Sequence, residues 1–170
     1  IEAYDMMGWT LSYQFNLQAK AANTPLKVKM ARVGELDFPQ GKVEGSGGTY
    51  LLDHAQNASF TAMNRILKAK GKIKWAKKPF TCNGQNYAEG TILASGCSRD
   101  FMEKLASSLK LNIQAVSSAP AIDSYEITIP RTGLYQSWVA VEDEGWTRYI
   151  LDEQEFSYRI LHDAEIRAGQ

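Results

Sequence analysis

Two residues near the C-terminal end, His162 and Glu165, have the types and spacing of metal ligands. They form an H-x-x-E pair within LHDAEIRAG. Catalytic zinc sites take three protein ligands and leave one position open for water. The other histidine of the chain is His54, so His54, His162 and Glu165 could supply two imidazoles and a carboxylate. Two fixed positions arise readily by chance, however, and the pair lies where a predicted strand ends and the chain turns, which favours solvated polar residues in a loop.

The segment EDEGWTR is a second candidate. Its acids Glu142, Asp143 and Glu144 come at the start of a predicted helix, where the exposed amides and the helix dipole favour negative charge. We interpret the acids as capping residues and expect Trp146 to pack back on a sheet. The alternative is a ligand-binding cluster of Asp143, Glu144, Trp146 and Arg148 at the carboxyl end of the preceding strand, where open α/β sheets place their ligands.

Two further groups of residues are weaker candidates for a functional site. The stretch KAKGKIKWAKK surrounds Trp75 with lysines, and charge around an aromatic ring is typical of single-strand nucleic-acid platforms. Alternation instead favours a Trp75 that faces the core and lysines that face solvent. Cys82 and Cys97 fall at opposite ends of a predicted strand if that strand returns from the turn, so we expect free thiols, because a disulfide needs Cα atoms within about 7 Å.

The overall composition limits the possible partners. Lysine plus arginine and aspartate plus glutamate number 19 each, which gives a formal net charge of zero. No long-range field therefore attracts nucleic acid, and we expect no nucleic-acid partner. No apolar run approaches the roughly 20 residues of a spanning helix, so no membrane span is predicted.

The elements that must position the candidate residues alternate between strand and helix. Before residue 49, the patterns predict a helix over 7–18, a strand over 26–32 and a loop or hairpin tip over 34–48. From there the patterns predict a strand over 49–54, a helix over 55–71 and strands over 72–80 and 90–95. A second helix over 98–111, with Ser98 as its N-cap, and a strand over 112–118 follow. Residues 118–130, with two prolines, form the predicted boundary. A strand over 131–138, a helix over 143–154 and a strand over 156–163 follow.

This order predicts an α/β fold with a mixed sheet and flanking helices (β-α-β-β-α-β), followed by a βαβ unit. We expect a linking or accessory domain over 1–120 and the βαβ unit over 130–170. A parallel βαβ unit alone leaves the faces of its sheet unburied. Either it adds to the first sheet, or it is the first unit of a second domain.

Three blocks in residues 130–169 resemble a segment of large bacterial secreted proteins of the zinc carboxypeptidase (carboxypeptidase A-like) family. They are R-x-G-L-Y-x-x-W at 131–138, D-E-G-W-T-R at 143–148 and D-A-E-I-R-A-G at 163–169. The preceding region resembles the stretch that links two domains in those proteins, through YDMMGWTL at 4–11 and YLLDHAQNASFTAMNRIL at 50–67.

The resemblance implies an upstream peptidase domain and a following class I glutamine amidotransferase-like domain with a flavodoxin-like layer. The family's zinc ligands belong to the upstream domain and its triad cysteine to a strand beyond Gln170. The resemblance therefore implies no catalytic residue, metal ligand or cofactor in this segment, and zinc in the parent protein alone. It also implies the peptidase domain of the same chain as a partner, a peptide substrate within reach, and a periplasmic or extracellular location.

Three hypotheses follow from these residues. The first is a non-catalytic accessory region of a secreted zinc metallocarboxypeptidase, with a structural or a substrate-contacting role. The second is a small zinc hydrolase that uses His54, His162 and Glu165. The third is a ligand-binding module that uses the EDEGWTR segment as a loop.

Overall fold

The computed structural model describes residues 12, 17–32, 34 and 39–169. Residues 1–37 and 38–170 form two separate units. In the first, residues 17–32 contain no helix or strand. The strand predicted over 26–32 is therefore wrong: its alternating Leu26, Val28 and Met30 are exposed, because a strand is stable only when a neighbouring strand pairs with it. The helix predicted over 7–18 lies mostly outside the described residues.

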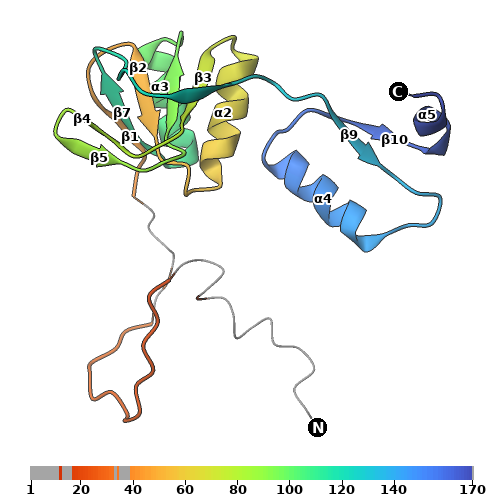
Figure 1. Ribbon diagram of the computed structural model, residues 1–170. Helices are drawn as coiled ribbons and strands as arrows, with labels where there is room; N and C mark the ends of the chain where they lie inside the picture. Colours follow the sequence, from red (N-terminus) through yellow and green to blue (C-terminus); the bar gives the residue numbers. More distant parts are fainter. Residues whose placement is uncertain (1–11, 13–16, 33, 35–38, 170) are drawn as a thin grey trace. The chain divides into compact units, whose positions relative to one another are not determined.

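The second unit contains a mixed sheet of six strands, which confirms the predicted α/β fold (Figure 1). The strand order is β1-β7-β2-β6-β3-β8, with β1 parallel to β7 and every other pair antiparallel. Its centre is the β-α-β-β-α-β unit predicted from sequence, in the split arrangement of ferredoxin-like folds. The elements are β2 (Thr49–Leu52), α2 (Ala58–Lys68), β3 (Lys72–Ala76), β6 (Ile92–Ser95), α3 (Arg99–Leu109) and β7 (Asn112–Val116).

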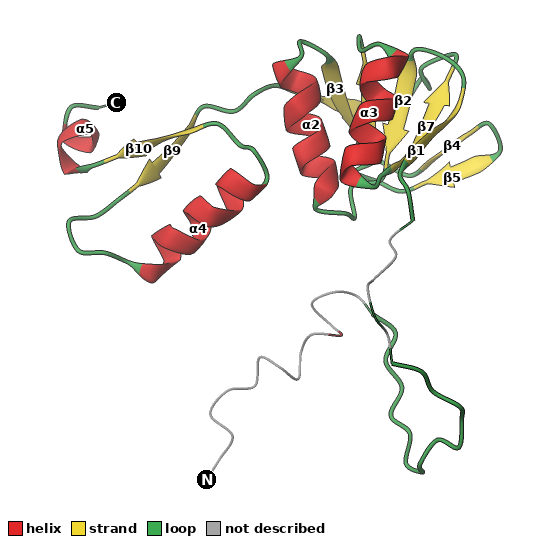
Figure 2. Ribbon diagram, turned by 180° about the vertical axis from the view of Figure 1, so that it is seen from behind, coloured by secondary structure: helices red, strands yellow, loops and turns green. Residues whose placement is uncertain are grey.

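Helices α2 and α3 lie side by side on one face of this sheet (Figure 2). Because side chains alternate along a strand, Tyr50, Ile73, Ile92 and Ile113 all point into this layer, where they are almost fully buried. The helices contribute Ala62, Met63 and Ile66 from α2 and Met102, Leu105 and Ala106 from α3. The predicted N-cap of α3 is confirmed, since the Phe101 amide donates to Ser98 Oγ at 3.2 Å.

A short hairpin packs against the opposite face. It consists of β4 (Phe80–Cys82) and β5 (Gln85–Tyr87), joined at Asn83 and Gly84. Both turn residues have positive φ, 51° and 77°, which is the signature of a type I′ hairpin turn. Phe80 and Tyr87 stack on each other and pack against a second buried cluster of Leu51, Ala76, Leu93 and Val116. Cys82 and Cys97 are both free thiols.

Two edge strands occur in segments where the sequence patterns predict no strand. β1 (Lys42–Gly45) lies in the predicted loop, and β8 (Ser124–Ile127) lies in the predicted boundary segment. Neither strand is predicted from sequence, because glycines and prolines flank these short strands and their partners are distant in sequence. β1 is also held by Arg99 of α3, which donates to the carbonyl oxygens of Val43 and Gly45.

The βαβ unit forms a separate sheet of two parallel strands. It contains β9 (Thr132–Tyr135), α4 (Glu142–Glu153) and β10 (Tyr158–Leu161), and α5 (Asp163–Arg167) follows. The unit does not extend the six-stranded sheet. Among the described residues, none after Val116 is classed as buried, and large apolar side chains from Ile129 to Ile166 are exposed.

Two glycines of this unit provide a matched test of its packing. A Cβ added at Gly133 would lie 2.5 Å from Leu161 Cδ1, whereas one added at Gly145 in α4 would meet nothing within 4 Å. We expect Gly133→Ala to destabilise the unit by about 1 kcal/mol through overpacking and Gly145→Ala to stabilise it by about 1 kcal/mol, because alanine is the better helix former. Urea unfolding followed by circular dichroism measures both; equal effects would contradict this packing.

Candidate functional site

The H-x-x-E pair forms the start of a helix. His162 is the N-cap of α5, and its amide donates to Glu165 Oε2 at 3.0 Å. The His162 ring Nδ1 lies 3.2 Å from the carbonyl oxygen of Gln136. Hydrogen bonds from the amides of Glu165 itself and of His162 hold the pKa of the Glu165 carboxyl below its usual value. The spacing is thus that of a capping box, in which a carboxylate three residues on binds the N-cap amide.

The third member of the predicted metal site, His54, follows β2. Its Nδ1 lies 3.8 Å from Asp53 Oδ1, and its ring packs against Gly90. His54, His162 and Glu165 do not come together, since no three His, Cys, Asp or Glu side chains of the described residues are placed to hold a metal ion. Within the described part of the chain, these three side chains therefore do not form a zinc site.

The EDEGWTR segment is helical and forms the first two turns of α4. Glu144 and Arg148 pair along the helix at 2.6 Å, and the Glu144 hydrogen bond raises the pKa of the Arg148 guanidinium. Trp146 is 61% exposed and meets Tyr149 edge-on. The prediction that Trp146 packs back on the sheet is therefore wrong. The predicted loop cluster separates into a paired Glu144 and Arg148 and an exposed Asp143 and Trp146.

A hollow of about 510 Å³ lies at the carboxyl ends of β9 and β10, the edge where open α/β sheets bind ligands. It is lined by Gln136, Ser137, Trp138, His162, Asp163 and Ala164. At this edge the Tyr135 hydroxyl donates to Asp163 Oδ1 at 2.5 Å, which raises the pKa of Tyr135. Trp138 is 97% exposed, so the hollow is open and has an aromatic rim.

A polar cluster joins α2 to the segment that follows α4, and we call it the α2–α4 junction. Its members are Thr61, Asn64, Arg65 and Lys68 on α2 and Gln154 and Glu155 after α4. The buried side chains of Thr61 and Asn64 donate to Gln154 Oε1 at 2.9 Å and to the Gln154 carbonyl at 2.8 Å. Buried polar groups of this kind are costly unless they are paired, so Gln154 is a required partner for α2.

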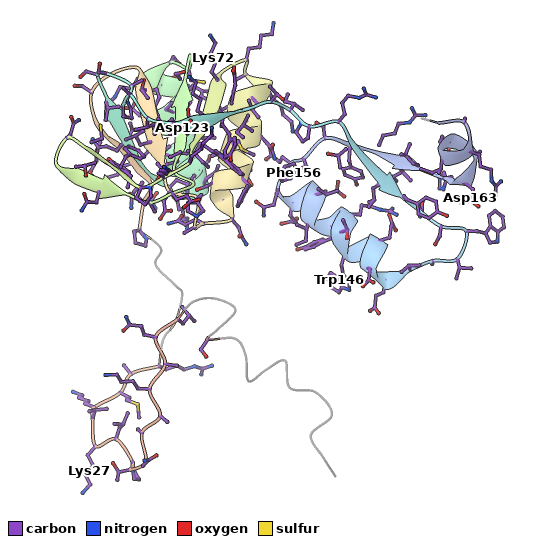
Figure 3. The ribbon with its side chains drawn as sticks, viewed as in Figure 1. Lys27, Lys72, Asp123, Trp146, Phe156 and Asp163 are labelled. Atoms are coloured by element: carbon purple, nitrogen blue, oxygen red, sulfur yellow. The ribbon has the colours of Figure 1, made fainter. Side chains whose placement is uncertain are left out.

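Arg65 and Glu155 form the charged part of the junction. Arg65 Nη2 lies 2.6 Å and Nε 3.0 Å from Glu155 Oε1, and Lys68 Nζ donates to the Glu155 carbonyl at 2.8 Å. The next residue, Phe156, packs against the core cluster of the six-stranded sheet and is labelled in Figure 3. The junction thus ties the βαβ unit to α2. Its two halves are about ninety residues apart, and no local sequence signal predicts it.

Glu155 is the residue at which helix α4 ends. Glu155 has φ 56°, and its amide and that of Phe156 donate to the carbonyls of Asp152 and Leu151, which is the Schellman ending of a helix. Glycine is the usual residue there, because other side chains are strained at positive φ. Lys70 ends α2 in the same conformation, with φ 62°, and Glu155 differs from it in that its carboxylate also binds Arg65.

These contacts predict a pH-sensitive junction. The hydrogen bond from Arg65 lowers the pKa of Glu155 below its ordinary 4.5. A carboxyl whose folded-state pKa is depressed stabilises the fold above its unfolded pKa, and this stabilisation is lost as the pH falls through the folded value. Glu155→Gln should therefore cost about 1 kcal/mol at pH 7 and little at pH 3.

Glu153→Gln is the matched control, because Glu153 is exposed and makes no ion pair with the described residues. Urea unfolding at pH 7 and pH 3 measures the free energy of unfolding of both variants. Equal losses for the two variants at pH 7, or a Glu155→Gln loss that is the same at both pH values, would contradict the assignment.

The chain was compared with family models, with curated proteins and with solved structures, and none of the three comparisons gives a match. Within the described part of the chain, no helix combines the length and apolar character needed to cross a bilayer.

Proposed function

We propose that the chain is a non-catalytic accessory region of a secreted zinc metallocarboxypeptidase-like protein. In this role the six-stranded sheet is a scaffold, and the βαβ unit is the first unit of an amidotransferase-like layer. The observation that carries the proposal is how the βαβ unit is attached and how little of it is buried. It is held to α2 by specific bonds, yet none of its described residues is classed as buried. Parallel strands are stable when both faces of their sheet are covered, so this unit is suited to receive further protein.

The positions of the three resembling blocks support the same proposal. Gly133 in the first block allows close contact with Leu161. Tyr135 in the first block bonds to Asp163 in the third. In the second block, Glu144 pairs with Arg148. The blocks therefore coincide with residues that build the βαβ unit, as expected if they preserve a structural role. The upstream peptidase domain is the proposed partner, and the proposed location is periplasmic or extracellular.

A measurement of zinc binding distinguishes this proposal from the competing hypothesis of a small zinc hydrolase. An accessory region of this kind should hold no stoichiometric zinc, because Glu165 and His162 are used in the helix cap. We expect the chain, dialysed against micromolar zinc and then metal-free buffer, to retain less than about a tenth of an equivalent, since a three-ligand site would hold zinc far more tightly. Mass-spectrometric metal analysis measures this, with His162→Ala as the control.

One tightly held zinc that His162→Ala releases would overturn the proposal in favour of the hydrolase. The partner is tested separately, with the upstream peptidase domain that this proposal requires. We expect that domain and this chain, produced as two proteins, to co-elute on size-exclusion chromatography. Separate elution at tens of micromolar would contradict the accessory role.

A further inference from the structure

Helix α4 has its apolar side outward. The side chains that face inward include Glu144 and Arg148, and Glu144 is only 14% exposed. The outward side carries Trp146, Tyr149 and Ile150, which are 61, 53 and 55% exposed. Figure 3 shows Trp146 on the side of α4 that faces away from β9 and β10. In α2 and α3 the apolar side chains are instead buried against the sheet. Amphipathic helices of soluble domains normally follow that second arrangement.

The outward side of α4 also has an unusual charge pattern. Residues 142, 143, 146, 149, 150 and 153 lie on one stripe, because they recur at helical spacing. The stripe therefore has an aromatic and aliphatic centre, with Glu142 and Asp143 at one end and Glu153 at the other. None of these three carboxylates pairs with a cation among the described residues. Glu153 sits in the last turn, where α4 has no basic residue and where the helix dipole disfavours a negative charge.

We propose that this outer face of α4 is a docking surface for a protein segment whose apolar residues are bracketed by lysine or arginine at both ends. Exposed aromatic side chains in a group mark interaction sites on soluble proteins, and Trp and Tyr are the residues that contribute most at interfaces. The carboxylates at the two ends select a partner with basic ends through charge complementarity.

The same charges distinguish this partner from other occupants. In an antiparallel pair of α4 helices from two copies, Glu142 would lie opposite Glu153, and the like charges would repel. Nucleic acid and anionic lipid both carry phosphates, which the carboxylates also repel. A basic, amphipathic protein segment is the occupant that satisfies both the apolar centre and the acidic ends.

A synthetic helical peptide with a leucine stripe and two lysines at each end tests the proposal. We expect saturable binding to the full chain by isothermal titration calorimetry. A twin peptide with glutamates in place of the lysines should bind at least tenfold more weakly. Trp146→Ala should also weaken binding at least tenfold, and because Trp146 is exposed, this variant keeps the fold, as circular dichroism will show.

Charge reversal in the chain tests the contacts between the carboxylates at the ends of the α4 stripe and the lysines of the peptide. Glu153→Lys should weaken binding of the lysine peptide about fivefold, which is the effect of one ion pair at the rim of an interface. A lysine in the last turn also interacts favourably with the helix dipole, so the substitution should not destabilise α4. Glu89→Lys, at an exposed position outside α4, makes the same change in net charge and should leave binding unchanged. Absence of saturable binding, equal binding of both peptides, or a dimer that Trp146→Ala abolishes would overturn the proposal. This titration and the zinc measurement have separate readouts, so either proposal can fail alone.

Discussion

Helix α2 makes contacts on two of its sides, one to the six-stranded sheet and the other to the residues that follow α4. Both the sheet and the βαβ unit depend on these contacts. One side buries Ala62, Met63 and Ile66 against the sheet. Another side places Thr61, Asn64 and Arg65 against Gln154 and Glu155. The first contact derives from the hydrophobic effect, at about 1.5–3 kcal/mol for each large side chain that is fully buried. The second consists of directional hydrogen bonds, which contribute less energy but fix geometry.

The two parts that meet at α2 differ in how fully they bury apolar surface. The six-stranded sheet has clusters of buried side chains on both faces. The βαβ unit exposes Trp138, Trp146 and Tyr149. Because it cannot bury much surface itself, its geometry depends on bonds such as those from Arg65 to Glu155 and from Tyr135 to Asp163. This imbalance supports both the accessory role and the docking surface on α4.

The candidate residues show how a structural motif can resemble a chemical one. A carboxylate three residues after a polar residue suits two ligands of a metal, and it equally suits the cap of a helix. His162 and Glu165 form such a cap. Likewise, Glu144 and Arg148 at i and i+4 pair along α4. In each case, the backbone context of the residues decides between the two interpretations.

The sequence alone determined the order of the main elements. Period-two alternation around Ile73 and Trp75 and helical spacing around Met63 and Ile66 are local signals, because each reflects one buried face of one element. The Ser98 cap is local in the same way. The edge strands β1 and β8 were not predictable, since the partners that stabilise them are distant in sequence.

Tertiary structure decided which side of α4 faces the strands. The sequence of α4 contains both an aromatic stripe and an ion-paired stripe, and local spacing cannot choose between them. Only packing against β9 turns Trp146 outward. In the same way, Gln154 and Glu155 acquire their role only when folding brings them to Thr61 and Arg65. Contacts between residues about ninety positions apart have no periodic signal, because nothing in either segment alone specifies its partner.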